Sequence, residues 1–248
     1  MTPVGWFFGR LLWGFSVVIE SFFSGPALVH RNTFQKGGNA LTVTYNVTNR
    51  DPNSAGGVRF TNKVGLNYTK QTLANSTNFI WAIFQQTVDA DKRLYTTLNC
   101  FVENTTNGYI AYTVGNEIHL GTSYIQSYSG NIKTEVTGII FHEATHVWQW
   151  FGNSSTPRGL IEGIADYVRL KAGYAVSNWA QNGQGSRWDE GYSVTARFLD
   201  YCNGLRNGFV AELNKKMRTG YSNNFFVKLL GKTPEQLFAD YKAKYKTA

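Results

Sequence analysis

Residues 141–150 read FHEATHVWQW and contain the pattern His-Glu-x-x-His. His142 and His146 are four residues apart, so on an α-helix both imidazoles lie on one face and can bind the same metal ion. Glu143 projects beside them and is placed to take a proton from a metal-bound water. The stretch therefore predicts a zinc site on a helix. The alternative is a buried helix whose histidines only satisfy local hydrogen bonds.

The residues around this pattern favour a helix over residues 131–151. Ile140, Ala144 and Val147 recur at helical spacing and form an apolar side. The two histidines and Gln149 fall on the opposite side. The helix is therefore expected to anchor itself in a core on one side and to present its chemistry on the other.

A second helical segment follows at residues 158–174, RGLIEGIADYVRLKAGY. Glu162 and Asp166 are four residues apart and share its polar face. A catalytic zinc takes three protein ligands and leaves a fourth position for water, so either carboxylate is a candidate third ligand. Spacing does not choose between them, and an ordinary solvated helix face is the alternative. Gly159 and Gly163 lack side chains and are expected to let this segment approach the first helix closely.

Several separated stretches resemble one known family in the same order. They are GGVRF (56–60), FIWAIFQQ (79–86), NEIHLG (116–121), YIQSYSGNI (124–132), HEATHVWQW (142–150), GLIEGIADYVRLKAGY (159–174) and the segment 191–232. Residues 41–246 are thereby similar to the plant basic secretory proteins, a family grouped with zinc metallopeptidases of plants and bacteria. The resemblance implies a zinc peptidase that acts on peptides or proteins and has a role in plant defence.

The Glu-Gly pair at residues 162–163 and the Glu-x-x-x-Asp spacing also resemble the gluzincins. In that group the glutamate is the third zinc ligand and the aspartate hydrogen-bonds a ligand histidine. The resemblance thus implies that Glu162 binds Zn²⁺ and that Asp166 fixes the tautomer of one histidine. It further implies an α+β, zincin-like fold with a small mixed sheet and an active-site helix, followed by a mostly helical C-terminal half.

Length and composition are those of a globular protein. The chain has 248 residues, of which 42% are hydrophobic and 15% aromatic, so it can bury a full core and is neither disordered nor fibrous. We expect one metallopeptidase domain at residues 28–248. The sheet and zinc helix would occupy residues 28–151, and the helical part residues 152–248.

Residues 1–27 have the features of a secretory signal peptide. Arg10 precedes an apolar run at residues 11–19, and the small residues 25–27 suit cleavage before Leu28. The run is too short to span a membrane, and a poorly ordered extension is the alternative. Secretion to the plant apoplast or cell wall would make five Asn-x-Ser/Thr sequons glycosylation sites. These sequons begin at Asn46, Asn67, Asn75, Asn104 and Asn153.

Two cysteines, Cys100 and Cys202, are present in the sequence. One pair permits one disulfide, and two buried free thiols are the alternative. Neither cysteine belongs to a C-x-x-C pattern. No redox or metal-binding role is therefore predicted for them.

Residues 41–121 are predicted to be mostly strands with one helix. Alternating apolar and polar residues indicate strands at 41–47, 94–102 and 109–120, and helical periodicity indicates a helix at 72–86. The Gly-Gly pair at residues 56–57 predicts a turn.

Residues 116–120, NEIHL, form the last strand before the predicted zinc helix. In zincins the strand at this place is usually a sheet edge that pairs with extended peptide substrate. Asn116, Glu117 and His119 are therefore candidate substrate-binding residues, with Glu117 and His119 on one face. The alternative is that both are solvent-exposed strand residues. His119 is a poor fourth ligand because a catalytic zinc keeps that position open.

A long loop is predicted at residues 178–191 and a helix at 192–205. The phenol of Tyr192, at the start of this helix, would stabilise an oxyanion if it reaches the zinc, so Tyr192 is a candidate catalytic residue. Aminopeptidase-type gluzincins have a tyrosine near this place, but Trp188 stands at their spacing. Ordinary packing is the alternative role for Tyr192.

Basic residues are concentrated at the C-terminal end. From residue 215 onward the sequence has eight lysines and arginines but only two acidic residues, Glu235 and Asp240. This segment therefore carries +6 of the chain's net charge of +8. Such a segment favours contact with an anionic cell-wall polysaccharide, and two solvated helices are the alternative. No nucleic-acid recognition motif accompanies the charge, so nucleic acid is not expected as a partner.

Together these features predict zinc-dependent peptide hydrolysis. Zn²⁺ would be held by His142, His146 and Glu162, and Glu143 would act as general base. One alternative is a catalytically weak or inactive secreted protein for defence or cell-wall binding that retains a structural zinc. The other is an aminopeptidase instead of an endopeptidase.

Overall fold

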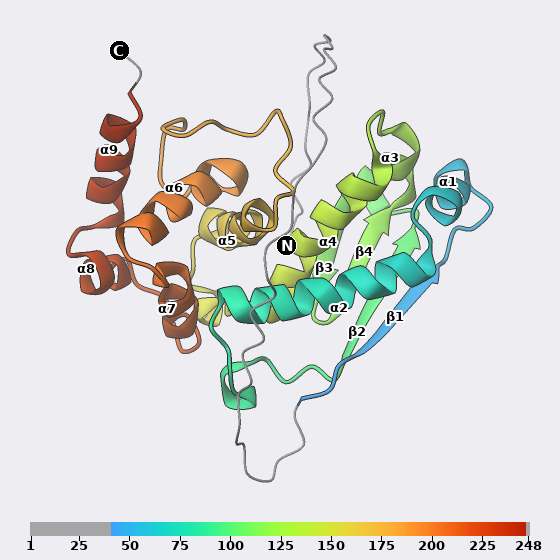
Figure 1. The fold of residues 1–248 in the computed structure, drawn as a ribbon, viewed down its shortest axis with the longest axis horizontal. Helices are drawn as coiled ribbons and strands as arrows, with labels where there is room; N and C mark the ends of the chain where they lie inside the picture. Colours follow the sequence, from blue (N-terminus) through green and yellow to red (C-terminus); the bar gives the residue numbers. More distant parts are fainter. Residues whose placement is uncertain (1–40, 247–248) are drawn as a thin grey trace, which may run out of the picture. The chain divides into compact units, whose positions relative to one another are not determined.

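The computed structural model of the chain describes residues 41–246, which belong to one compact unit. The predicted signal peptide and the predicted start of the mature chain lie outside the described residues. Figure 1 labels the helices and strands.

Four strands of the described chain form a mixed sheet in the order β1-β2-β4-β3. They are β1 (Thr44–Asn49), β2 (Thr97–Glu103), β3 (Ala111–Val114) and β4 (Glu117–Gly121). β1, β2 and β4 run parallel, and β3 is antiparallel to β4. Every second residue of β2 is fully buried, so one face of the sheet is covered.

Helices α2 (Leu66–Ile83) and α4 (Ile132–Trp148) cover this face of the sheet (Figure 1). α2 packs against β1 and α4, and α4 packs against β3 and β4. Trp148 at the end of α4 is fully buried, and its indole N–H donates to Thr77 Oγ1 in α2 at 3.1 Å. The sheet and these helices confirm the predicted α+β class.

The turn predicted at residues 56–57 is wrong, because both glycines lie inside helix α1 (Ala55–Lys63). Ser54 caps this helix by accepting a hydrogen bond from Gly57 N–H at 3.0 Å. A Cβ on Gly56 would overlap the backbone carbonyl of Thr122, in the short helix α3 (Thr122–Ser127). The glycines therefore serve the close packing of α1 and not a chain reversal.

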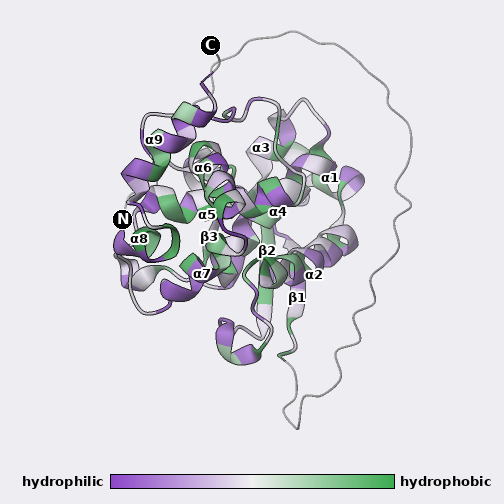
Figure 2. Cartoon of the chain, turned by 60° about the vertical axis from the view of Figure 1, so that its left-hand side comes forward, coloured by the Kyte–Doolittle hydropathy of each residue, from purple (hydrophilic) through white to green (hydrophobic). Residues whose placement is uncertain are grey.

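Five helices make up the second half of the described chain. They are α5 (Arg158–Lys171), α6 (Tyr192–Leu205), α7 (Phe209–Lys216), α8 (Asn224–Leu230) and α9 (Pro234–Lys244). Figure 2 shows hydrophobic residues gathered where the elements face one another and hydrophilic residues on the outward turns. Within residues 41–246, no helix combines the length and the hydropathy of a membrane span.

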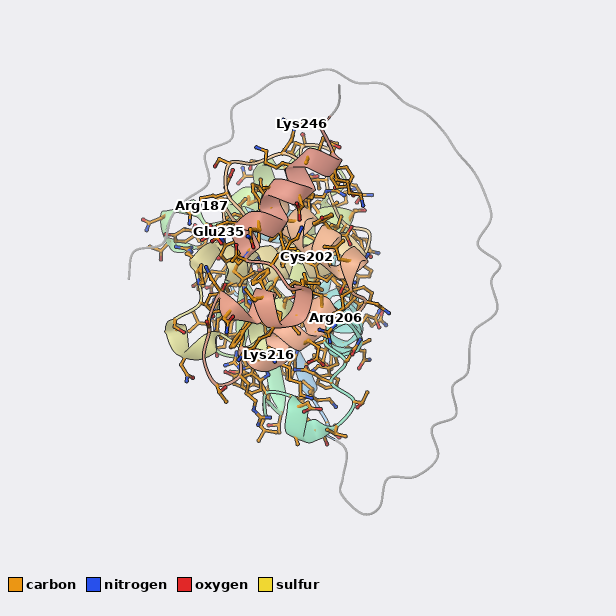
Figure 3. The ribbon with its side chains drawn as sticks, turned by 90° about the vertical axis from the view of Figure 1, so that its left-hand side faces the viewer. Arg187, Cys202, Arg206, Lys216, Glu235 and Lys246 are labelled. Carbon is orange, nitrogen blue, oxygen red and sulfur yellow. The ribbon has the colours of Figure 1, made fainter. Side chains whose placement is uncertain are left out.

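Cys100 in β2 and Cys202 in α6 are free, fully buried thiols. In Figure 3, Cys202 lies within the helical half, whereas the exposed residue Lys246 lies at its upper edge. Burial raises the pKa of both thiols, so they stay protonated. The structure thus decides the open question in favour of free thiols.

Gly159 and Gly163 do not mediate a close approach of α5 to α4, which corrects the prediction. A Cβ on Gly159 would overlap the carbonyl of Asp189, and one on Gly163 would overlap the side chain of Thr195 in α6. The glycines indicate close packing correctly. Their partner differs because tertiary packing, and not local spacing, sets the rotation of α5 about its axis.

Gly163→Ala is expected to lower the free energy of unfolding by about 1–3 kcal/mol, because the added methyl overpacks the α5–α6 contact. The control is Gly204→Ala in α6, where nothing lies within 4 Å of the Cβ position. Alanine favours helix, so this change should be neutral or stabilising by up to about 1 kcal/mol. Urea unfolding in the presence of a chelator measures both variants. Equal stability of the two would contradict the predicted overpacking.

Candidate metal centre

The predicted zinc helix is α4, and both of its ends are held by side chains. Asn131 caps the first turn, and Arg93 donates to the carbonyls of His146 and Val147 at 3.3 and 3.0 Å. These bonds satisfy backbone groups that a helix end leaves unpaired. Core residues at most 1% exposed anchor the helix, among them Val136, Ile140, Ala144 and Val147. The position of both histidines is therefore fixed by packing and capping.

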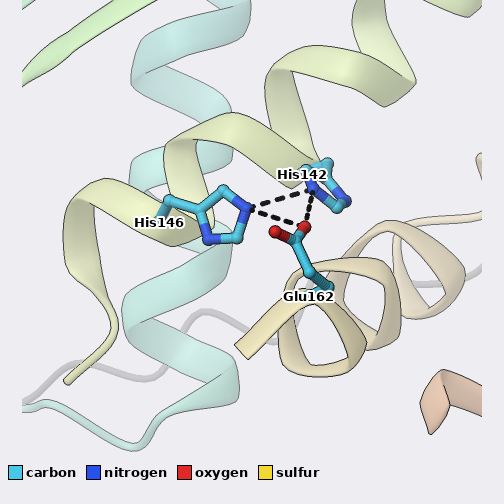
Figure 4. A group of neighbouring side chains, drawn as sticks. All are labelled: His142, His146 and Glu162. Atoms are coloured by element: carbon cyan, nitrogen blue, oxygen red, sulfur yellow. Dashed lines mark hydrogen bonds and ion pairs between the residues drawn. The ribbon is translucent and has the colours of Figure 1, made fainter. Parts of the chain in front are cut away.

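His142, His146 and Glu162 converge from α4 and α5 (Figure 4). The Nε2 atoms of the two histidines are 3.1 Å apart, and Glu162 Oε2 lies 3.3 and 3.4 Å from them. A tetrahedral zinc ion bound at about 2.0–2.1 Å sets its ligand atoms about 3.3–3.4 Å apart. Two imidazoles and one carboxylate are also a donor set of catalytic zinc sites. The three residues fit Zn²⁺ in both spacing and chemistry.

Asp166 lies on the other nitrogen of His142. His142 Nδ1 donates to Asp166 Oδ1 at 2.7 Å, and Asp166 is buried. Glu162 thus lies on the Nε2 side of His142 and Asp166 on the Nδ1 side. This difference distinguishes the two carboxylates, which sequence spacing alone could not do. A carboxylate at Nδ1 keeps the hydrogen on that atom and leaves Nε2 available to a metal.

The surroundings of the cluster favour positive charge. Burial by itself would lower the pKa of His142, but Asp166, Glu162 and Glu143 outweigh burial and raise the pKa to about 10. Burial likewise tends to raise the pKa of Glu162, but hydrogen bonds from both histidines hold this pKa well below its usual range. A divalent cation suits this acidic environment and would displace the imidazole protons.

Gln149 holds His146 from the side opposite the cluster. Its Nε2 lies 2.6 Å from His146 Nδ1, while its buried Oε1 has no hydrogen-bond partner. A histidine that binds metal through Nε2 carries its hydrogen on Nδ1 and needs an acceptor there. Exchanging the amide oxygen and nitrogen by a half-turn supplies that acceptor. We expect Gln149 to orient His146 when metal is bound.

Gln149→Leu is expected to weaken zinc binding by about 10–100-fold, because the Nδ1–H of His146 then has no acceptor. Gln149→Glu is the control, since a carboxylate oxygen accepts the same hydrogen bond and should keep zinc affinity near wild type or above it. Competition with a chromophoric chelator measures the affinity. If leucine and glutamate at this position bind zinc equally well, Gln149 does not orient His146.

Glu143 lies next to the cluster and is 6% exposed. Its Oε2 accepts a hydrogen bond from the hydroxyl of Thr113 in β3 at 2.6 Å. The Glu143 carboxylate thus accepts a hydrogen bond close to the histidines. It is not one of the three groups that could bind the metal. Thr113 carries no sequence signal of this role, because it meets α4 only through the tertiary fold.

Tyr192 is close to the cluster, as its candidate role requires. Its ring is nearly parallel to that of His142, with centroids 6.2 Å apart. Burial, followed by the charge of Glu162, raises the pKa of Tyr192 to about 12, so the phenol remains a hydrogen-bond donor. Its φ of 46° is unusual for a residue with a side chain, a strain that is often found at functional sites.

Trp188 is 6% exposed and has its contacts elsewhere. Its indole N–H donates to Glu235 in α9 at 3.0 Å, and its ring packs edge-on against Phe226 in α8. The residue at the gluzincin tyrosine spacing is therefore part of the core of the helical half. Tyr192, and not Trp188, lies beside His142.

The predicted edge strand at residues 116–120 is wrong. β4 lies between β2 and β3, so β3 is the edge strand next to α4. The prediction failed because the chain turns at Gly115, where φ is 60°, and the hairpin places β3 outside β4. Asn116 is in this turn and donates to the carbonyl of Thr97 at 2.7 Å.

Glu117 and His119 lie on one face of the sheet, as predicted, and this is the face turned away from α4. Their substrate-binding role stays a prediction. They alternate with Ile118, which is fully buried on the helix-covered face. His119 stacks on Tyr112 at 4.4 Å and hydrogen-bonds Glu103 at 2.7 Å on the opposite face. His119 is thus held by neighbours within the sheet.

Comparison with known proteins identifies the family to which the chain belongs. The family described as "Peptidase of plants and bacteria" matches residues 40–241. The "Basic secretory protease" of Boswellia serrata is 52% identical over 58 residues, which is 23% of this chain and 66% of that protein, just under two thirds of its length. No solved structure matches the chain significantly. Because the family match spans most of the sequence and includes the cluster of His142, His146 and Glu162, the chain belongs to the family of peptidases of plants and bacteria.

Proposed function

We propose that the protein is a zinc-dependent peptidase. The observation that carries this proposal is the spacing of 3.1–3.4 Å among the donor atoms of His142, His146 and Glu162. Zinc bound there would lower the pKa of a water and polarise the scissile carbonyl. Membership of a peptidase family supports a peptide or protein as the substrate.

Glu143 is proposed as the general base. It follows a ligand directly but projects about 100° further round the helix, so it can face the reacting water without binding the metal. Its carboxylate would accept the proton of the attacking water and pass it to the leaving amine. The partly buried hydrogen bond from Thr113 restricts the orientation of the carboxylate.

Tyr192 is proposed to stabilise the oxyanion. A phenol with a raised pKa stays protonated at neutral pH and donates a hydrogen bond to the oxygen on which negative charge develops. Its ring lies beside that of His142, so Tyr192 belongs to the immediate surroundings of the cluster.

The open edge of β3 is proposed to bind the substrate as an added strand. Gly121 N–H donates to the carbonyl of Ile110 at 2.9 Å, and hydrogen-bonded positions alternate in an antiparallel pair. Ala111 and Thr113 therefore direct their N–H and C=O groups away from β4. An extended peptide would pair with these groups close to Glu143.

The experiment that tests this function is cleavage of internally quenched peptides by the purified protein. Peptides with blocked termini should be cleaved, cleavage should stop when a chelator removes the metal, and zinc should restore it. Cleavage of peptides with a free amino terminus alone would indicate an aminopeptidase. No cleavage of a broad peptide set by zinc-loaded protein would favour the alternative, a binding protein with a structural zinc.

Secretion to the apoplast or cell wall and a role in defence belong to the same proposal. The word "secretory" in the name of the Boswellia serrata relative supports secretion, and all five sequon asparagines are exposed. The exposed basic C-terminal segment supports contact with anionic wall polysaccharide. Protein recovered from tissue with an intact Met1 and no glycan mass would contradict secretion.

A further inference from the structure

The hydroxyl of Thr113 has two acceptors, both on Glu143. Thr113 Oγ1 lies 2.6 Å from Glu143 Oε2 and 3.1 Å from the Glu143 carbonyl oxygen. A hydroxyl has one hydrogen to donate, and the shorter contact has the length of a charge-assisted bond to a carboxylate. The hydrogen is therefore assigned to the carboxylate.

Strand geometry directs this side chain toward α4. Thr113 pairs with Ile118 of β4, which is fully buried on the helix-covered face, and paired residues of neighbouring strands point to the same face. The main chain of Thr113 meanwhile faces the open edge of β3. Thr113 thus connects two parts of the site. Its main chain belongs to the strand edge where substrate would pair, and its side chain contacts the carboxylate that would act as base.

We propose that Thr113 is a positioning residue for Glu143, an inference that rests on the proposed function. The bond to Oε2 leaves Oε1 of the same carboxylate to accept the proton of the attacking water. It also restricts rotation of the carboxylate, which a general base within hydrogen-bond reach of its proton requires. Because the bond starts from β3, a substrate strand paired there would be aligned with the base.

Two variants separate this role from simple packing of β3 on α4. Thr113→Val keeps the shape and both branches of the side chain but removes the donor, whereas Thr113→Ser keeps the donor and removes the methyl. Thr113→Val should lower kcat by about 10–100-fold, the effect expected of a lost hydrogen bond to a charged group. KM should change less than about threefold and zinc content should stay near one per chain, because the ligands are untouched. Thr113→Ser should restore kcat to within about threefold of wild type.

A double-mutant cycle completes the test. In a Glu143→Gln background, Thr113→Val should cause no further loss of residual hydrolysis, because the base that it positions is gone. This inference alone would be overturned if the wild type hydrolyses peptide and Thr113→Val has the same kcat as the wild type. It would also be overturned if kcat in Thr113→Ser were as low as in Thr113→Val. Absence of hydrolysis in the zinc-loaded wild type would overturn the proposed function and this inference with it.

Discussion

Glu162→Ala is expected to abolish stoichiometric zinc binding and all metal-dependent hydrolysis. Its Oε2 is one of three donor atoms within 3.4 Å of one another, and two histidines alone leave the ion without its third protein ligand. Metal analysis after dialysis against a weak chelator measures the loss.

Asp166→Asn is the matched control for this change. Asparagine still offers an oxygen to His142 Nδ1 but carries no charge, so zinc affinity should fall by only about 10–100-fold. If Asp166→Ala abolishes zinc binding while Glu162→Ala retains about one zinc per chain, the two carboxylates have the opposite roles.

Glu143→Gln is expected to keep zinc near one per chain while hydrolysis falls by about 10²–10⁴-fold. Glutamine preserves the size of the side chain and can still accept the hydrogen bond from Thr113, but it cannot take a proton. Zinc content and initial rate from the same preparation separate catalysis from folding. Wild-type hydrolysis by the zinc-loaded variant would show that Glu143 is not the general base.

The elements predicted best from sequence are those with long helical periodicity. α4 and α5 lie within their predicted ranges, and α6 has the predicted bounds, residues 192–205. Their apolar repeats extend over several turns, so local pattern and tertiary packing agree. α1 was missed because two adjacent glycines are a turn signal in sequence, although here they allow close contact with Thr122.

The candidate site was predictable only as far as spacing determines it. His142, Glu143 and His146 belong to one helix, and a fixed helical spacing brings them together. The distinction between Glu162 and Asp166 depends on how α5 is rotated against α4, which their own four-residue separation cannot show. Thr113 could not be found from sequence, because its role depends on which strand becomes the sheet edge beside α4.

Zinc dependence of peptide hydrolysis is tested by titrating the metal-free protein with zinc while hydrolysis of an internally quenched peptide is followed. We expect the metal-free protein to be inactive, and the rate to rise linearly with added zinc and to reach its maximum at about one equivalent per chain. Full hydrolysis by protein that carries far less than one metal ion per chain, or no rate increase at saturating zinc, would contradict this expectation.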